Sequence, residues 1–133
     1  MSEWYGVARS NRFAVKDIDA FRKAIEHLEI DVAKQLEDND VIIYSNNENG
    51  GWNDIYFCEE TNEYIGVDFY KIIQEHLVDG EVAILLEVGN EKFNYLSGEA
   101  IAISTTEINS ISLCDIYDIA RKMTDKEFSY AEY

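Results

Sequence analysis

The chain has 133 residues, of which 47% are hydrophobic and 13% aromatic, and its formal net charge is −16. This length predicts one folded domain, and the aromatic content excludes a disordered acidic tail. Eleven lysines and arginines against 27 acids argue against direct nucleic-acid binding, which needs cations to neutralise phosphates.

The negative charge is concentrated in residues 35–70, here called the acidic window. This window holds nine carboxylates and no lysine or arginine, whereas residues 1–34 are neutral and residues 71–133 carry −7. Such a surface either keeps a small protein in solution or meets a basic partner. The nine acids are Glu37, Asp38, Asp40, Glu48, Asp54, Glu59, Glu60, Glu63 and Asp68.

The N-terminal part predicts a strand, a helix and a second strand. Residues 4–15 alternate loosely, which is typical of a strand or a hairpin. Asp17 is a suitable N-cap for a helix whose apolar residues recur at intervals of three and four, namely Ile18, Phe21, Ile25 and Leu28. Residues 29–35 favour a strand.

The acidic window predicts a hairpin between two acidic turns. Residues 37–40 form a turn by composition, and the β-branched run 41–44 predicts a strand. Residues 45–51 are rich in Asn and Gly and predict a loop. We expect residues 52–58 to form a strand that pairs back on 41–44 across this loop, with a polar turn following at 59–63.

The C-terminal half predicts a second helix and further strands. Asp68 is expected to cap a helix over residues 68–77, and the apolar run 81–88 predicts a central strand. Gly89 and Asn90 are expected to open a turn. Strands at 92–96 and 99–104 are expected next, separated by residues 97–98.

A third helix is expected near the C-terminus. Ser112 and Asp115 resemble a capping box that starts a helix running to about Met123. The acidic tail 124–133 is expected to be frayed. Short loops between strands favour hairpins, so residues 1–133 predict a single α+β domain with a mostly antiparallel sheet and about three helices packed on one face.

The sequence carries no recognisable catalytic or metal-binding motif, so we expect neither an enzyme nor a cofactor. His27 and His76 have no neighbours at zinc-ligand spacing, and the acidic loops do not match a calcium-binding loop. Cys58 and Cys114 lie in apolar segments and are expected to be buried reduced thiols. Residues 1–5 lack the features of a signal peptide, and no apolar run approaches the about 20 residues of a membrane span, which predicts a cytoplasmic protein.

Aromatic residues within the acidic window are candidates for a partner-binding site. Such residues serve either as core packing or as anchors that face arginine and lysine among carboxylates. The expected partner-binding set is Glu37, Asp38, Asp40, Glu48, Asp54, Glu59, Glu60, Glu63, Trp52 and Tyr56.

Two stretches of the chain resemble small proteins carried by phages and mobile elements. Residues 8–17, followed by Phe21, resemble the start of such proteins, and residues 80–92 with 112–117 are similar to their second half. The setting of those proteins resembles that of anti-CRISPR and anti-restriction inhibitors. This resemblance implies an inhibitor of a defence effector in a bacterial host cell. The charge pattern indicates how it would act, because carboxylates spread along one face can present a field comparable to that of DNA to a basic nucleic-acid site.

The same charge pattern also suits other binding proteins. An immunity protein or antitoxin that neutralises a basic toxin would use the same electrostatics, and an adaptor could be acidic for solubility alone. Residues 4–15 or an unpaired strand edge are candidates for a homodimer contact, but a dimer centred on residues 37–68 would bring like charges together.

Overall fold

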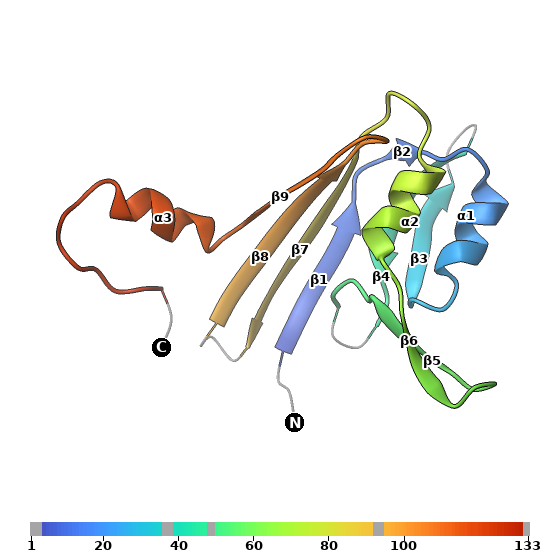
Figure 1. Ribbon diagram of the computed structural model, residues 1–133, viewed down its shortest axis with the longest axis horizontal. Coiled ribbons are helices and arrows are strands. Elements are labelled where there is room, and N and C mark those ends of the chain that lie inside the picture. The colour runs from blue at the N-terminus through green and yellow to red at the C-terminus, as the bar shows by residue number, and fades with distance from the viewer. Residues whose placement is uncertain (1–3, 36–38, 48–49, 92–94, 132–133) are drawn as a thin grey trace.

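The computed structural model describes residues 4–35, 39–47, 50–91 and 95–131. These residues form an α+β domain with three helices and an antiparallel sheet, which confirms the predicted fold class. Figure 1 shows two helices beside the sheet, a small hairpin projecting below them, and a helical arm at the opposite end of the molecule.

Seven strands form the main sheet, in the order β2-β4-β1-β7-β8-β9, and β3 pairs with the other side of β4. The predicted central strand is β7, which pairs with β1 and β8 along its length. The strands are β1 Trp4–Ser10, β2 Phe13–Ala14, β3 Ile30–Gln35, β4 Asp40–Ser45, β7 Ala83–Glu91, β8 Tyr95–Ile103 and β9 Ile108–Ser112.

The two helices that cover the sheet begin at the predicted caps. In α1 (Ile18–Ile25) the Asp17 carboxylate accepts hydrogen bonds from two backbone N–H groups of the first turn, at 3.0 and 3.2 Å. In α2 (Phe69–His76) the Asp68 carboxylate accepts one from Lys71 at 3.1 Å. These bonds satisfy donors that a helix start leaves unpaired. None of the described helices is long and apolar enough to cross a membrane.

The core lies between these two helices and the covered face of the sheet. Each helix buries residues three and four positions apart, and the sheet contributes alternate residues from its strands. Ser10 is the one buried polar side chain in the described part of the core, and its hydroxyl accepts the Ile43 N–H at 3.0 Å. The largest fully buried side chains are Phe13, Phe21, Ile25, Leu28, Ile43, Ile73, Leu77, Leu85 and Ile103.

The predicted hairpin between residues 41–44 and 52–58 is wrong. The described strand within 52–58 is β5 (Ile55–Cys58), and it pairs with β6 (Glu63–Gly66) in a separate two-stranded sheet. The short turn 59–62 brings β6 close with less loss of entropy than closing the longer loop onto β4. Residues 4–15 do not fold into a hairpin either, because β1 pairs mainly with β7 and β2 pairs with β4.

Two further predicted breaks lie inside continuous strands. Gly89 and Asn90 continue β7, opposite Ser97 and Leu96, and Ser97 and Gly98 continue β8. Extended backbone is open to glycine and to small polar residues, so composition alone misplaced both breaks. The expected strand at 92–96 lies partly outside the described residues, and its last two residues belong to β8.

The third helix, α3 (Asp115–Arg121), lies away from the sheet (Figure 1) and buries no residue. Half of the predicted capping box is present, because the Ser112 N–H donates to the Asp115 carboxylate at 2.8 Å. The helix ends at Arg121 rather than Met123. Within the described part of the tail, the rings of Tyr130 and Tyr117 stack with centroids 4.0 Å apart.

Candidate functional site

The most distinctive surface is the acidic hairpin, which we define as residues 54–68. It comprises β5, β6 and the segments that join them to the body, and it carries five carboxylates and no lysine or arginine. Glu59 and Glu60 lie in its exposed turn and Glu63 begins β6, while Asp54 and Asp68 lie at its base. Among the described residues, none of these five acids is recorded in an ion pair.

Contacts at its base fix the hairpin to the body. The Asn53 side-chain amide donates to the Leu28 carbonyl at 3.2 Å, and the Tyr56 ring stacks on His27 at 4.7 Å. The Val67 N–H donates to the Asp54 carbonyl at 2.7 Å, which closes the open end of the hairpin. A two-stranded hairpin is marginally stable alone, so these contacts hold it in place.

One face of the hairpin presents apolar side chains to solvent. Phe57 and Tyr64 are cross-strand partners whose rings meet edge to face at 5.1 Å, and they are 45% and 71% exposed. Ile55, two residues before Phe57, is 48% exposed on the same face. An exposed aromatic pair beside Glu59 and Glu60 of the turn and Glu63 of β6 is a surface on which arginine or lysine side chains can bind.

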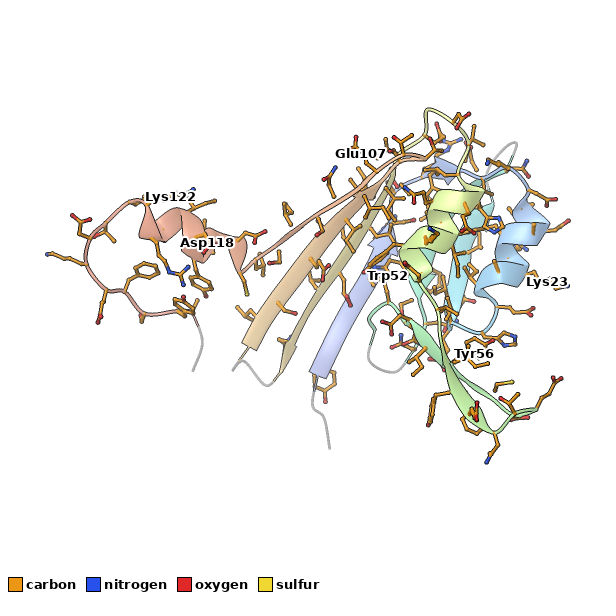
Figure 2. All side chains as sticks on the ribbon, viewed as in Figure 1. Lys23, Trp52, Tyr56, Glu107, Asp118 and Lys122 are labelled. Carbon is orange, nitrogen blue, oxygen red and sulfur yellow. The ribbon has the colours of Figure 1, made fainter. Side chains whose placement is uncertain are left out.

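The two aromatic residues predicted for the site point inward. Trp52 packs on Phe69 of α2 with ring centroids 5.3 Å apart, and both Trp52 and Tyr56 are half-buried against the core. Figure 2 places Trp52 beside the sheet and Tyr56 at the base of the hairpin. The Trp52 indole N–H is buried without an acceptor among the described residues. Phe57 and Tyr64 therefore supply the exposed aromatic surface.

The predicted acids do not all gather at the hairpin. Asp40 begins β4 and forms an ion pair with Arg12 at 3.0 Å, beside β2 and away from the acidic hairpin. Three predicted site residues, Glu37, Asp38 and Glu48, lie outside the described residues. The structure thus brings together Asp54, Glu59, Glu60 and Glu63 of the predicted set, and adds Asp68, Phe57 and Tyr64.

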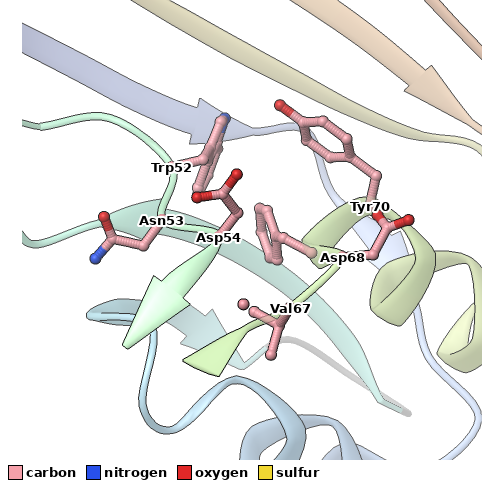
Figure 3. A pocket seen from close by; sticks show the side chains of 8 residues that line it. Trp52, Asn53, Asp54, Val67, Asp68 and Tyr70 are labelled. Atoms are coloured by element: carbon pink, nitrogen blue, oxygen red, sulfur yellow. The ribbon is translucent and has the colours of Figure 1, made fainter. Parts of the chain in front are cut away.

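A cleft of about 570 Å³ lies where the acidic hairpin meets α2 and the sheet (Figure 3). Trp52, Asp54, Asp68 and Tyr70 line it. Burial first, and then the charges of Glu99, Glu87, Asp54 and Asp68 in that order, together raise the pKa of Tyr70 to about 12. The phenol therefore stays neutral among carboxylates at pH 7.

Glu87 lies on the sheet at the edge of this region. Burial is the main reason that its pKa is raised, and its cross-strand partner Glu99 adds to the effect. A hydrogen bond from the Trp52 backbone N–H favours the charged form and opposes the shift. Carboxylates of the acidic hairpin and of the sheet thus both lie near Tyr70.

The cysteines differ from expectation in their exposure. Cys114 is exposed and Cys58 is half-buried at the end of β5, and both are free thiols. The hydroxyl and the backbone N–H of Thr61 lower the pKa of Cys58 by stabilising its thiolate. In the described part of the chain, no three His, Cys, Asp or Glu side chains gather to hold a metal ion.

The arrangement is suited to binding cationic side chains. It combines unpaired carboxylates, an exposed aromatic pair and a fixed base, which together can hold cationic side chains. The exposure of Phe57 could have been predicted from the sequence, because side chains alternate along a strand and the neighbours of an inward Tyr56 must point outward. The chain matches no known family model, and neither a curated protein nor a solved structure is significantly similar to it.

Proposed function

We propose that this protein inhibits a nucleic-acid-binding effector of bacterial defence, such as a CRISPR nuclease or a restriction enzyme, by binding its basic surface. The observation that carries this proposal is the acidic hairpin, with five carboxylates that have no recorded ion-pair partner among the described residues. The site of action is then the cytoplasm of the bacterial host.

The carboxylates of the acidic hairpin are complementary in charge to a protein surface that binds DNA. Duplex DNA presents one negative charge per about 1.7 Å of its axis, so its binding channel is lined with lysine and arginine. Carboxylates at the turn and the base of the acidic hairpin offer such a channel a spread of negative charge. Long-range attraction between the two surfaces would also speed their association.

The exposed aromatic pair adds short-range recognition to this attraction. An arginine guanidinium stacks on aromatic rings and forms paired hydrogen bonds with a carboxylate. Phe57 and Tyr64 lie between the acids of the turn and those of the base, so one bound arginine would reach both kinds of group. Interfaces of this composition concentrate binding energy in a few residues.

The test uses a panel of purified CRISPR nucleases and restriction enzymes, with a basic toxin nuclease as a third class of target. DNA cleavage is measured with and without this protein. We expect inhibition of at least one defence effector, lost when Glu59, Glu60 and Glu63 are replaced by lysine. Neutralisation of the toxin nuclease with no effect on any defence effector would contradict the proposal and support the immunity-protein alternative.

A further inference from the structure

The face of the sheet opposite the helices is apolar and uncovered. Along each strand, the residues that alternate with the core residues point to this side. Val7 lies opposite Val88, Leu86 lies opposite Ala100, and Ala100 lies opposite Ile111 on the neighbouring strands. Val7 and Ile111 are 65% and 68% exposed. We define the outer apolar face as Val7, Ile84, Leu86, Val88, Leu96 and Ile111.

The outer apolar face continues onto α3. Leu113 lies over Gly98, where an added Cβ would come within 3.0 Å of its Cγ atom and 3.5 Å of Val88. Beyond it, Ile116, Ile119 and Met123 are exposed at helical spacing. A groove of about 1,120 Å³ runs between the end of the sheet and α3. The helix lies beyond β9 and leaves the outer apolar face uncovered (Figure 1).

The charge distribution identifies the kind of partner that fits. Among the described residues, the outer side of β1, β7, β8 and β9 carries no carboxylate and one cation, Arg9 opposite Leu86, although the chain carries −16, so a basic protein would gain little there. A second copy of this chain can meet it without bringing carboxylates together. On α3, Asp118 is paired with Arg121 at 2.5 Å, which reduces repulsion between two arms.

The size of the surface is sufficient for a stable contact. Strands β1, β7, β8 and β9 have seven, nine, nine and five residues, and about half of these side chains point outward. Helix α3 adds seven residues. With about half of the α3 residues on one face, these elements come close to the about 20–30 residues per side that a standard protein interface uses. Monomers rarely leave so large an apolar surface open.

We propose that two copies of this chain form a two-fold symmetric dimer through the outer apolar face, with α3 of each copy lying on the sheet of the other. A two-fold contact places the same patch on both sides, which suits an apolar surface that carries no carboxylate. The acidic hairpin lies at the other end of the molecule from α3 and stays accessible in this dimer (Figure 1).

The test measures the mass of the full chain in solution by light scattering and sedimentation. We expect a particle of twice the 15.3 kDa chain mass. The double substitution Leu86→Gln and Val88→Gln is expected to weaken dimerisation about 100-fold, because each lost apolar contact at an interface core costs about tenfold. Ile119→Gln tests the contribution of α3 and is expected to weaken dimerisation about tenfold.

The matched control is Ile55→Gln, because Ile55 and Leu86 are both 48% exposed but Ile55 lies on the acidic hairpin. Circular dichroism confirms that each variant is folded, which we expect since these side chains are not in the core. A chain that stays at 15.3 kDa at the highest soluble concentration would overturn the proposal. So would a dimer broken by Ile55→Gln and unaffected by the double substitution.

Discussion

Reversing the charge of the hairpin turn separates a specific electrostatic site from the effect of net charge. Replacing Glu59, Glu60 and Glu63 with lysine changes the net charge from −16 to −10, since each reversal adds two charges. All three side chains are exposed and carry no recorded ion pair among the described residues. The fold should therefore be unaffected, because exposed substitutions of this kind change the free energy of unfolding within about 0.5 kcal/mol.

The expected loss of affinity follows from the number of pairs removed. An exposed charge pair contributes about 1.4- to 5-fold to a binding constant, so three lost pairs weaken binding by about 3- to 150-fold. The introduced lysines also repel a basic partner, so we expect a total loss of at least about tenfold. Most of it should appear in the association rate, and the difference from wild type should shrink at high salt.

A second triple variant provides the control for net charge. Glu75, Asp79 and Asp125 are exposed acids away from the acidic hairpin, and replacing them with lysine also gives −10. Stopped-flow or biosensor kinetics against the responsive effector should show near wild-type rates for this control. Equal weakening by both triples would refute the site and leave only a general charge effect.

Three further predictions concern the backbone at Gly50, the titration of Tyr70 and the reactivity of Cys58. Gly50→Ala should lower the free energy of unfolding by more than about 1 kcal/mol in chemical denaturation, because φ is +79° there and a Cβ would lie 1.7 Å from a backbone oxygen of β1. Alkaline titration followed at the tyrosinate absorbance band should show a component near pH 12 that Tyr70→Phe removes. The free energy of unfolding should fall as pH rises above about 10, because the Tyr70 phenol loses its proton at a lower pH in the unfolded chain than in the folded one. In a Cys114→Ser variant, the alkylation rate of Cys58 should rise with a midpoint below the usual thiol pKa of about 8.5, and Thr61→Val should move that midpoint upward.

The helices that cover the sheet could be predicted because their signals are local. Asp17 and Asp68 each precede an apolar pattern with helical spacing, and the caps form within three residues. The third helix was predicted for the same reason. Its position away from the sheet depends on where β9 ends, and no local pattern contains that information.

The partner of β5 could not be predicted because pairing is a long-range property. Residues 52–58 are compatible with pairing to β4 or to β6, and hydrophobicity does not distinguish these arrangements. The loop before β5 instead crosses β1 at Gly50, where it closely approaches the backbone of Gly6. This crossing carries Trp52 to the core and leaves β5 to pair with β6.

The candidate site was predicted in part for the same reasons. The turn at Glu59–Glu63 is encoded by its own composition, so its three acids were correctly grouped. Which aromatic side chains face outward depends on the register of β5, and that register exposes Phe57 while turning Tyr56 inward. Asp40 is close in sequence to the other acids but belongs to the other end of the sheet, beside Arg12.

The central claim is that the acidic hairpin occupies the nucleic-acid site of its partner. The most direct measurement is the apparent dissociation constant of the complex between this protein and the inhibited effector, at increasing concentrations of the effector's own DNA or RNA substrate. Competition for one site predicts that the apparent constant rises in proportion to substrate concentration. A constant that does not change with substrate would contradict occupation of that site and would require inhibition from another surface.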